Sequence, residues 1–413
     1  MTEYGLIGRK LGHSFSKDIH ARLGKYPYDL IELEPEQVEA FLKEKNFKGV
    51  NVTIPYKQTV IPFMDDMSRA ALEIGAVNCI KNDGGRLIGH NTDFDGLTAL
   101  IRRIGIDMKG RKVLILGTGG TSDTAFSVCR SEGACEVIKV SRRGNDGAAA
   151  VTYDEARKRH KDAQVIINAT PCGMYPDIFE VPLDLDDFSG LEGVCDVIYN
   201  PLRSMLVMQA LRKNVKAGGG LYMLVAQAVS ASEFFLGVKY ESSVVDKIYN
   251  EILSKKTNIV LAGMPGSGKS TAGKAIAEKL GRKFFDTDEI IAGRAGISIS
   301  EIFEKYGEEY FRNLETETVK SLAAENGAVI ATGGGVVMKK KNEELLKMNG
   351  RIVFIDRELK LLVPTADRPT AFDRKQLARR YEERYDIYRA AADVIIQNNG
   401  SREELVQKIL EEF

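Results

Sequence analysis

Two glycine-rich loops, each directly after a short apolar run, constrain the fold of this chain more than any other feature. The first loop, residues 117–122, follows the run 112–116, and the second, residues 263–270, follows the run 258–262. A glycine-rich turn between a strand and a helix leaves backbone N–H groups and the positive end of the helix dipole free to bind phosphate. The two loops therefore predict two nucleotide sites, each at the edge of an α/β sheet.

The length of 413 residues also requires more than one folded unit. A single hydrophobic core stops growing at roughly 250 to 300 residues, so two or three domains are expected. Short apolar runs alternate with helical patterns, which predicts α/β domains whose parallel sheets are covered by helices. We expect strands at residues 49–54, 112–116, 136–140, 164–168, 193–199, 258–262, 328–331 and 351–355.

Composition limits the partners of this chain. Lys+Arg and Asp+Glu are equal at 58 each, so no broad basic field is available to attract nucleic acid or a membrane. No apolar run approaches the length of a membrane span. The five cysteines form no C-x-x-C pair and there are only four histidines, which makes a structural metal site unexpected. We expect a cytoplasmic protein that binds small molecules; the sequence does not predict its oligomeric state.

The first loop is typical of a dinucleotide site, although Ser122 replaces the third glycine of the usual pattern. The next predicted strand ends in arginines, and a guanidinium at that position favours the 2′-phosphate of NADP. Solvent-exposed arginines, or NAD held by Asp146, remain alternatives. Asp123 suits the helix dipole but is expected to repel the cofactor phosphates. The predicted cofactor ligands are Gly117, Thr118, Gly119, Gly120, Thr121, Ser141, Arg142, Arg143 and Thr170.

Two segments upstream carry polar side chains at strand ends. Residues 51–57 predict a strand with Asn51 and Thr53 on one face, ended by Pro55, so that Lys57 lies in a loop. Asp93 follows the strand-like run 87–89, at an edge where open α/β sheets bind ligands. Taken alone, the lysine is typical of a surface charge and the segment around Asp93 of a turn.

Together these segments make residues 1 to about 250 similar to shikimate dehydrogenase. The matching strings are residues 4–8, 11–16, 51–57, 75–78, 91–93, 168–171, 199–201 and 223–227. The resemblance implies Lys57 and Asp93 as the catalytic pair, with Lys57 donating a proton as hydride reaches the substrate carbon. The substrate ligands it implies are Ser14, Ser16, Asn51, Thr53, Asn78, Tyr199 and Gln227.

The second loop matches the P-loop pattern at every fixed position. Its predicted nucleotide ligands are Gly263, Gly266, Ser267, Gly268, Lys269, Ser270 and Thr271. Lys269 should reach the β- and γ-phosphates of ATP, and Ser270 should hold Mg²⁺. Asp286 and Asp288 follow, and a spacing of two predicts both carboxylates on one strand face; a helix cap is the alternative.

From about residue 257 to the end, the chain resembles shikimate kinase. The resemblance rests on the P-loop, the two aspartates, the segments 302–303, 307–308 and 311–312, the glycines 333–335, the pair 368–369 and the region of Arg384. It implies Asp288, Arg312, Gly334 and Arg384 as ligands of the phosphoryl acceptor. It also implies Ser270 and Asp286 at the metal and Arg368 on a closing lid near the transferred phosphate.

The sequence therefore predicts a dehydrogenase at residues 1–252, a linker at 253–257 and a P-loop kinase at 258–413. Within the first part we expect a substrate subdomain at 1–98 and 220–252 and a Rossmann NADP-binding subdomain at 99–219. The two resemblances imply NADPH-dependent reduction of 3-dehydroshikimate, then phosphorylation of shikimate by ATP and Mg²⁺. The alternatives are an NAD-dependent quinate/shikimate dehydrogenase fused to another small-molecule kinase, and a nucleotide-sensing regulator without turnover.

Overall fold

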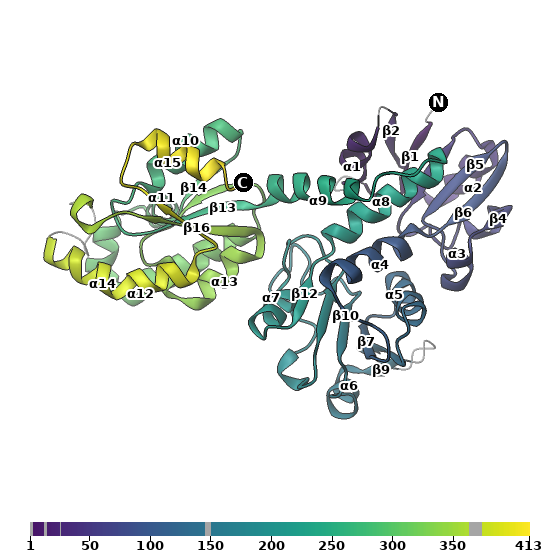
Figure 1. The fold of residues 1–413 in the computed structure, drawn as a ribbon, viewed down its shortest axis with the longest axis horizontal. Helices are drawn as coiled ribbons and strands as arrows, with labels where there is room; N and C mark the ends of the chain where they lie inside the picture. The colour runs from purple at the N-terminus through teal and green to yellow at the C-terminus, as the bar shows by residue number, and fades with distance from the viewer. Residues whose placement is uncertain (1–2, 12–14, 25, 145–149, 363–373) are drawn as a thin grey trace. The chain divides into compact units, whose positions relative to one another are not determined.

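The computed structural model describes residues 3–11, 15–24, 26–144, 150–362 and 374–413, and it divides into two compact units, Met1–Glu251 and Ile252–Phe413 (Figure 1). Ser14 and Arg368, both predicted site residues, lie outside the described residues. Most of the predicted linker, residues 253–257, is helical, because it belongs to α9 (Ser243–Lys256). The division into 1–252, 253–257 and 258–413 stays a prediction.

The first sheet of the first unit has the strand order β2-β1-β3-β5-β6-β4. Its strands are β1 (Tyr4–Gly8), β2 (Tyr28–Glu32), β3 (Gly49–Val52), β4 (Asp66–Met67), β5 (Cys79–Asp83) and β6 (Arg86–His90). The accompanying helices are α1 (Ser16–Leu23), α2 (Pro35–Glu44) and α3 (Arg69–Ile74). The predicted parallel arrangement is wrong for β5, which runs antiparallel to β3 and β6. Gly84 and Gly85 both have positive φ, 60° and 93°, and this permits the tight turn of a β5–β6 hairpin.

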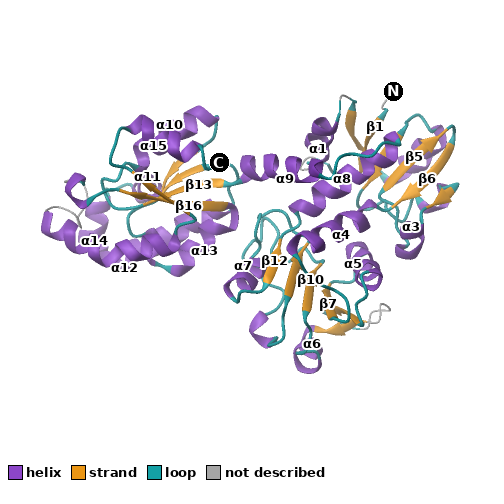
Figure 2. Cartoon of the chain, viewed as in Figure 1, coloured by secondary structure: helices purple, strands orange, loops and turns teal. Residues whose placement is uncertain are grey.

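The second sheet is parallel throughout, with the order β12-β11-β10-β7-β8-β9. Its strands are β7 (Lys112–Leu116), β8 (Glu136–Ser141), β9 (Ala150–Thr152), β10 (Val165–Asn168), β11 (Gly193–Asp196) and β12 (Lys216–Gly218). Helices α5 (Gly120–Ser131), α6 (Tyr153–Arg159) and α7 (Met205–Arg212) pack against strands of this sheet (Figure 2). All four residues of β10 are buried, as expected for a central strand covered on both faces.

Helices α4 (Thr92–Ile104) and α8 (Leu221–Leu236) pack against each other and connect the two sheets. Gly96 makes this close packing possible, since a Cβ atom there would lie 2.7 Å from the carbonyl oxygen of Met223 and 2.9 Å from Cβ of Gln227. α4 carries Asp93 in its first turn. The crossing therefore brings Asp93 and Gln227 to the same region of the first unit.

The second unit holds a five-stranded parallel sheet in the order β14-β15-β13-β16-β17. The strands are β13 (Asn258–Ala262), β14 (Phe284–Asp286), β15 (Val329–Ala331), β16 (Gly350–Asp356) and β17 (Val394–Gln397). The helices are α10 (Lys269–Leu280), α11 (Thr287–Ala295), α12 (Ile299–Ala323), α13 (Lys340–Asn349), α14 (Arg374–Ala391) and α15 (Arg402–Leu410). Every residue of the central β13 is buried. Across the described part of both units, no helix has the length and apolar character needed to cross a membrane.

Candidate active sites

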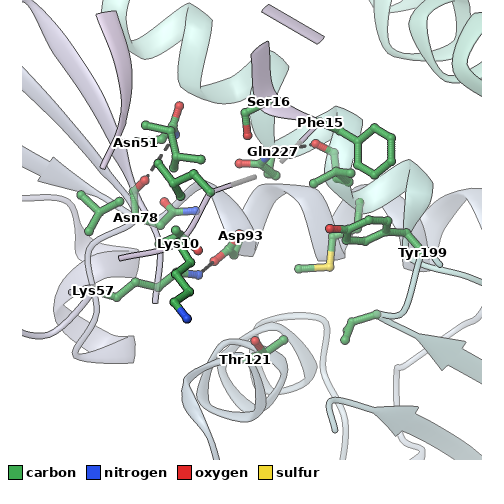
Figure 3. A pocket seen from close by; sticks show the side chains of 18 residues that line it. Lys10, Phe15, Ser16, Asn51, Lys57, Asn78, Asp93, Thr121, Tyr199 and Gln227 are labelled. Atoms are coloured by element: carbon green, nitrogen blue, oxygen red, sulfur yellow. Dashed lines mark hydrogen bonds and ion pairs between the residues drawn. The ribbon is translucent and has the colours of Figure 1, made fainter. Parts of the chain in front are cut away.

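A cavity of about 420 Å³ in the first unit gathers residues from the first sheet, from α4, α5 and α8, and from the loop after β11 (Figure 3). Nine predicted site residues line it: Ser16, Asn51, Thr53, Lys57, Asn78, Asp93, Thr121, Tyr199 and Gln227. Lys10 and Phe15 also line it and were not predicted. Phe15 packs edge-on against Tyr199, with ring centroids 5.5 Å apart. Polar groups far apart in the sequence thus meet in one site.

Lys57 and Asp93 form an ion pair in this cavity, with 2.5 Å between Nζ and Oδ2. The peptide carbonyl of Lys57 accepts a hydrogen bond of 2.8 Å from the N–H of Val77, which fixes the loop that follows β3. Both side chains are partly buried, at 26% and 16% exposure. The pair can therefore hold a proton at a defined position while one side stays open to a substrate.

The amide side chains of the cavity are held by the surrounding backbone. Asn78 Oδ1 accepts from the N–H of Thr92 at 2.7 Å, and Asn51 Nδ2 donates to the carbonyl of Asn78 at 3.3 Å. Gln227 Nε2 donates to the carbonyl of Leu224 at 2.9 Å. These side chains present donors and acceptors suited to a small polyhydroxy compound.

The first glycine-rich loop fits a dinucleotide phosphate. A Cβ atom built on Gly119 or Gly120 would meet nothing within 4 Å, so the backbone at the start of α5 faces open space. Gly117 has φ 111° and a Cβ there would lie 3.1 Å from the side chain of Thr170, which explains why this position needs glycine. Ser122 is buried and its hydroxyl donates to the carbonyl of Gly117 at 2.7 Å. Ser122 thus closes the loop where the usual pattern has a third glycine.

The charge on Asp123 is neutralised within the protein. Lys139 Nζ lies 2.5 Å from Asp123 Oδ1. This ion pair weakens the predicted repulsion between the Asp123 carboxylate and the cofactor phosphates. No local pattern predicts this pair, because Lys139 belongs to the next strand, β8. Arg142 and Arg143 follow β8 and are both exposed, so their guanidinium groups are accessible, whereas Asp146 lies outside the described residues.

The second glycine-rich loop has the conformation of a phosphate-binding loop. Gly263, Gly266 and Gly268 all have positive φ, at 148°, 78° and 97°, which explains their identity. Lys269 Nζ donates to the carbonyls of Gly263 and Met264, each at 2.9 Å. The Lys269 ammonium is thereby held over the loop, at the N-terminus of α10, where P-loop proteins bind the β- and γ-phosphates.

Asp286 and Asp288 do not share a strand face, so that prediction is wrong. β14 ends at Asp286, and Asp288 lies in the first turn of α11. Asp286 caps this helix, since its Oδ1 accepts from the N–H groups of Asp288 and Glu289. Its Oδ2 accepts from the Ser270 hydroxyl at 2.6 Å. The cap and the Ser270 contact therefore coexist, and these two oxygen ligands suit Mg²⁺.

A second, smaller cavity beside the P-loop collects the predicted acceptor ligands Asp288, Arg312, Gly334 and Arg384. Arg384 Nη1 donates to the carbonyl of Gly334 at 3.0 Å. The glycine run leaves space for the acceptor ligands, because a Cβ on Gly333 would lie 2.4 Å from Asp288 Oδ1 and one on Gly335 would lie 1.9 Å from Arg312 Nη1. The cavity combines guanidinium groups with a carboxylate, as an anionic alcohol requires.

Glu315 is a member of this site that we did not predict. Its side chain is 1% exposed and lies 2.5 Å from Arg312 Nη1. Burial raises the pKa of the Glu315 carboxyl, and the Arg312 guanidinium opposes this rise. Its position three residues after Arg312 on α12 gave a possible i,i+3 signal, but helix surfaces show many such pairs. Glu315 orients Arg312 within the cavity.

Comparisons with known proteins agree with this geometry. Residues 6–80 match the family model for the shikimate dehydrogenase substrate binding domain, and residues 265–413 match the model for shikimate kinase. A Clostridium perfringens protein named shikimate dehydrogenase (NADP(+)) is 33% identical over 268 residues, covering 61% of this chain and 98% of that protein.

Solved structures resemble the first part of the chain. A chorismate mutase/shikimate 5-dehydrogenase fusion protein from Clostridium acetobutylicum superposes with a TM-score of 0.58 at 32% identity, covering 61% of this chain and 97% of that one. Quinate dehydrogenase from Corynebacterium glutamicum, in complex with NAD, gives 0.55 at 26% identity, covering 61% and 98%. The chain therefore belongs to the shikimate dehydrogenase family and carries a shikimate kinase domain after it, which makes it a bifunctional enzyme.

Proposed function

We propose that the first unit reduces 3-dehydroshikimate to shikimate with NADPH and that the second unit phosphorylates the 3-hydroxyl of shikimate with ATP. The observation that carries this proposal is the ion pair of Lys57 and Asp93 at 2.5 Å, in a cavity that also reaches Thr121 of the first glycine-rich loop. The name of the Clostridium perfringens relative supports NADP as the cofactor. The exposed arginines after β8 support the same choice, since they can bind a 2′-phosphate.

Reduction of a ketone requires a hydride at the carbonyl carbon and a proton at the oxygen. The nicotinamide supplies the hydride when the cofactor is bound. Lys57 donates the proton to the oxygen, and Asp93, which accepts a hydrogen bond from Lys57, keeps the ammonium in position. Asn51, Asn78 and Gln227 bind the polar groups of the ring. Each of these side chains lines the same cavity.

Phosphoryl transfer in the second unit depends on positioning and on neutralising charge. Arg312 and Arg384 bind the substrate carboxylate, and Asp288 orients the attacking hydroxyl and accepts its proton. With ATP and Mg²⁺ bound, Lys269 would contact the β- and γ-phosphates, and Ser270 and Asp286 would hold the metal. Arg368 as a lid residue stays a prediction, since it lies outside the described residues.

A one-pot assay with 3-dehydroshikimate, NADPH, ATP and Mg²⁺ tests the function, with NADPH followed by absorbance and products identified by mass. We expect shikimate 3-phosphate only when both nucleotides are present. Accumulation of unphosphorylated shikimate would contradict the kinase assignment. Phosphorylation of added shikimate without NADPH consumption would contradict the dehydrogenase assignment.

The same assay distinguishes the quinate alternative. Run in the oxidative direction, it compares shikimate with quinate and NADP⁺ with NAD⁺. We expect kcat/KM to be highest for shikimate with NADP⁺. Equal or better turnover of quinate with NAD⁺ would replace the proposed substrate and cofactor of the first unit.

A further inference from the structure

Tyr28, which neither the sequence patterns nor the cavity lining identifies, is bonded to a residue of the substrate site. Its hydroxyl donates to Asn51 Oδ1 at 2.7 Å, and both residues are buried. Tyr28 lies on β2 and Asn51 on β3, with β1 between them. Strands two positions apart are about 10 Å apart, and the long tyrosine side chain carries its hydroxyl across this distance. The bond therefore joins a tyrosine outside the cavity lining to Asn51, which lines the cavity.

The same hydroxyl contacts a second residue of the substrate site. The Ser16 side chain, at the start of α1, interacts with the Tyr28 hydroxyl and opposes the rise in the pKa of Tyr28. Because the single Tyr28 hydrogen is directed at Asn51, the Ser16 hydroxyl can face the Tyr28 oxygen only as a donor. This buried oxygen atom thus lies between a strand ligand and a helix ligand of the proposed substrate.

The Tyr28 ring is held in place by a stacking contact with His20. His20 on α1 stacks on it, with ring centroids 3.8 Å apart and an interplanar angle of 9°. Burial lowers the pKa of His20 to about 3, so this stack is uncharged at neutral pH. Burial also raises the pKa of Tyr28 well above its usual value, so its hydroxyl keeps its proton and remains a donor.

The direction of this donation determines what Asn51 offers to the substrate. An asparagine amide has an oxygen end and a nitrogen end of nearly the same shape, and its partners decide which end faces where. Tyr28 occupies the oxygen end. One N–H of Asn51 donates to the carbonyl of Asn78, which leaves the second N–H as the group available to the cavity.

We infer that Tyr28 is a positioning residue for the dehydrogenase reaction, which fixes Asn51 as a donor toward the substrate and holds Ser16 beside it. This inference rests on the proposed function of the first unit. Tyr28 has no contact with the glycine-rich loop among the bonds of the described residues. Its role is therefore restricted to binding the hydroxy acid and does not extend to the dinucleotide.

Tyr28→Phe tests this inference because it removes one oxygen atom and keeps the ring stacked on His20. We expect KM for 3-dehydroshikimate and Kd for shikimate, measured by calorimetry, to rise about 5- to 30-fold, because the variant leaves the buried Asn51 oxygen without its Tyr28 donor. We expect kcat to change less than about 3-fold and Kd for NADPH less than about 2-fold. The kinase activity of the same chain reports whether the protein is folded and should be unchanged.

Tyr26→Phe is the matched control. Tyr26 belongs to the same buried cluster, bonding to His20 Nδ1 at 2.6 Å and donating to Ser232 Oγ at 2.8 Å, but it does not reach Asn51. We expect its KM for 3-dehydroshikimate to stay within about 2-fold of that of the unmodified protein. Equal rises in both variants, no rise in Tyr28→Phe, or a fall in kcat alone would overturn the inference. If the unmodified chain does not reduce 3-dehydroshikimate, the proposed function fails instead.

Discussion

Asp196, at the end of β11, is a buried carboxyl group that hydrogen bonds hold without a cationic partner among the described residues. Its oxygens accept from the N–H of Ile198 at 3.0 Å, from Asn168 Nδ2 at 3.1 Å and from the Ser204 hydroxyl at 2.5 Å. Asn168 Oδ1 in turn accepts from the hydroxyl of Thr170 at 2.7 Å. Asp196 therefore connects the loop after β11 with the predicted cofactor ligand Thr170.

This arrangement makes the stability of the first unit depend on pH. Burial raises the pKa of Asp196 to about 6, although the bonds from Ser204, Ile198 and Asn168 lower it. The folded state therefore binds this proton more tightly than the unfolded state, whose pKa is 3.8. The stabilisation is full below pH 3.8 and is lost as pH rises through 6. The shift of about 2 pH units corresponds to about 3 kcal/mol.

Asp196→Asn removes this titration. We expect the free energy of unfolding of the full chain, relative to the variant, to increase as pH is lowered from 7 to 4.5. Urea unfolding followed by circular dichroism measures this, and the kinase unit, identical in both proteins, is the internal reference. A stability difference that is the same at both pH values would show that Asp196 does not titrate in this range.

At the scale of elements, the glycine run after β15 connects backbone geometry with substrate binding. Gly335 has φ −105°, which alanine adopts without strain, and the three atoms nearest to a Cβ there all belong to the Arg312 guanidinium, the closest at 1.9 Å. Gly335→Ala should therefore displace the Arg312 side chain and leave the fold intact. We expect Kd for shikimate at the kinase site to rise about 10- to 100-fold, the range for a lost charge-assisted hydrogen bond, with ATP affinity unchanged.

Gly293→Ala on α11 is the control for this change. A Cβ at Gly293 would meet nothing within 4 Å, and alanine favours a helix by up to about 1 kcal/mol over glycine. This variant should bind shikimate and ATP as the unmodified protein does. Titration calorimetry with each ligand separates the outcomes, and a Gly335→Ala protein with normal shikimate affinity would refute the packing argument.

Local sequence signals predicted several elements, although the expected strands 49–54 and 193–199 end earlier, at Val52 and Asp196. Contacts that depend on sheet order were not predicted. The strand 112–116 agrees with β7 at both ends because its apolar run and following glycines are local signals. Tyr28 and Asn51 can bond because β2 and β3 both neighbour β1, which puts their strands two positions apart. No pattern in either segment encodes that order. The Asp286 pair was misplaced for another reason. Its spacing fits a strand, but the capping side chain of Asp286 ended the strand and began α11.

At the scale of the whole molecule, neither unit shares a sheet or an apolar cluster with the other among the described residues: the first unit contains two sheets and the second contains one. The core around β7 and β10 belongs to the first unit, and the core around β13 and β16 to the second. The catalytic pair of the first unit and the P-loop of the second share no residue. A substitution in one site should therefore leave the other reaction at full rate, so the two activities can be separated genetically within one chain.

Complementation between two inactivated chains tests how the intermediate passes. Lys57→Met removes the proton donor, and we expect it to abolish NADPH oxidation while shikimate phosphorylation continues. Asp288→Asn should lower phosphoryl transfer at least 100-fold with ATP binding kept, since it removes the group that accepts the proton.

Mixed together, the two proteins should convert 3-dehydroshikimate to shikimate 3-phosphate after a lag, because a tethered intermediate escapes into solution unless the path is enclosed. Mass spectrometry with time should show free shikimate during the lag. If the Lys57→Met protein fails to phosphorylate both added shikimate and the shikimate released in the mixture, the two activities do not act independently, and the prediction is wrong.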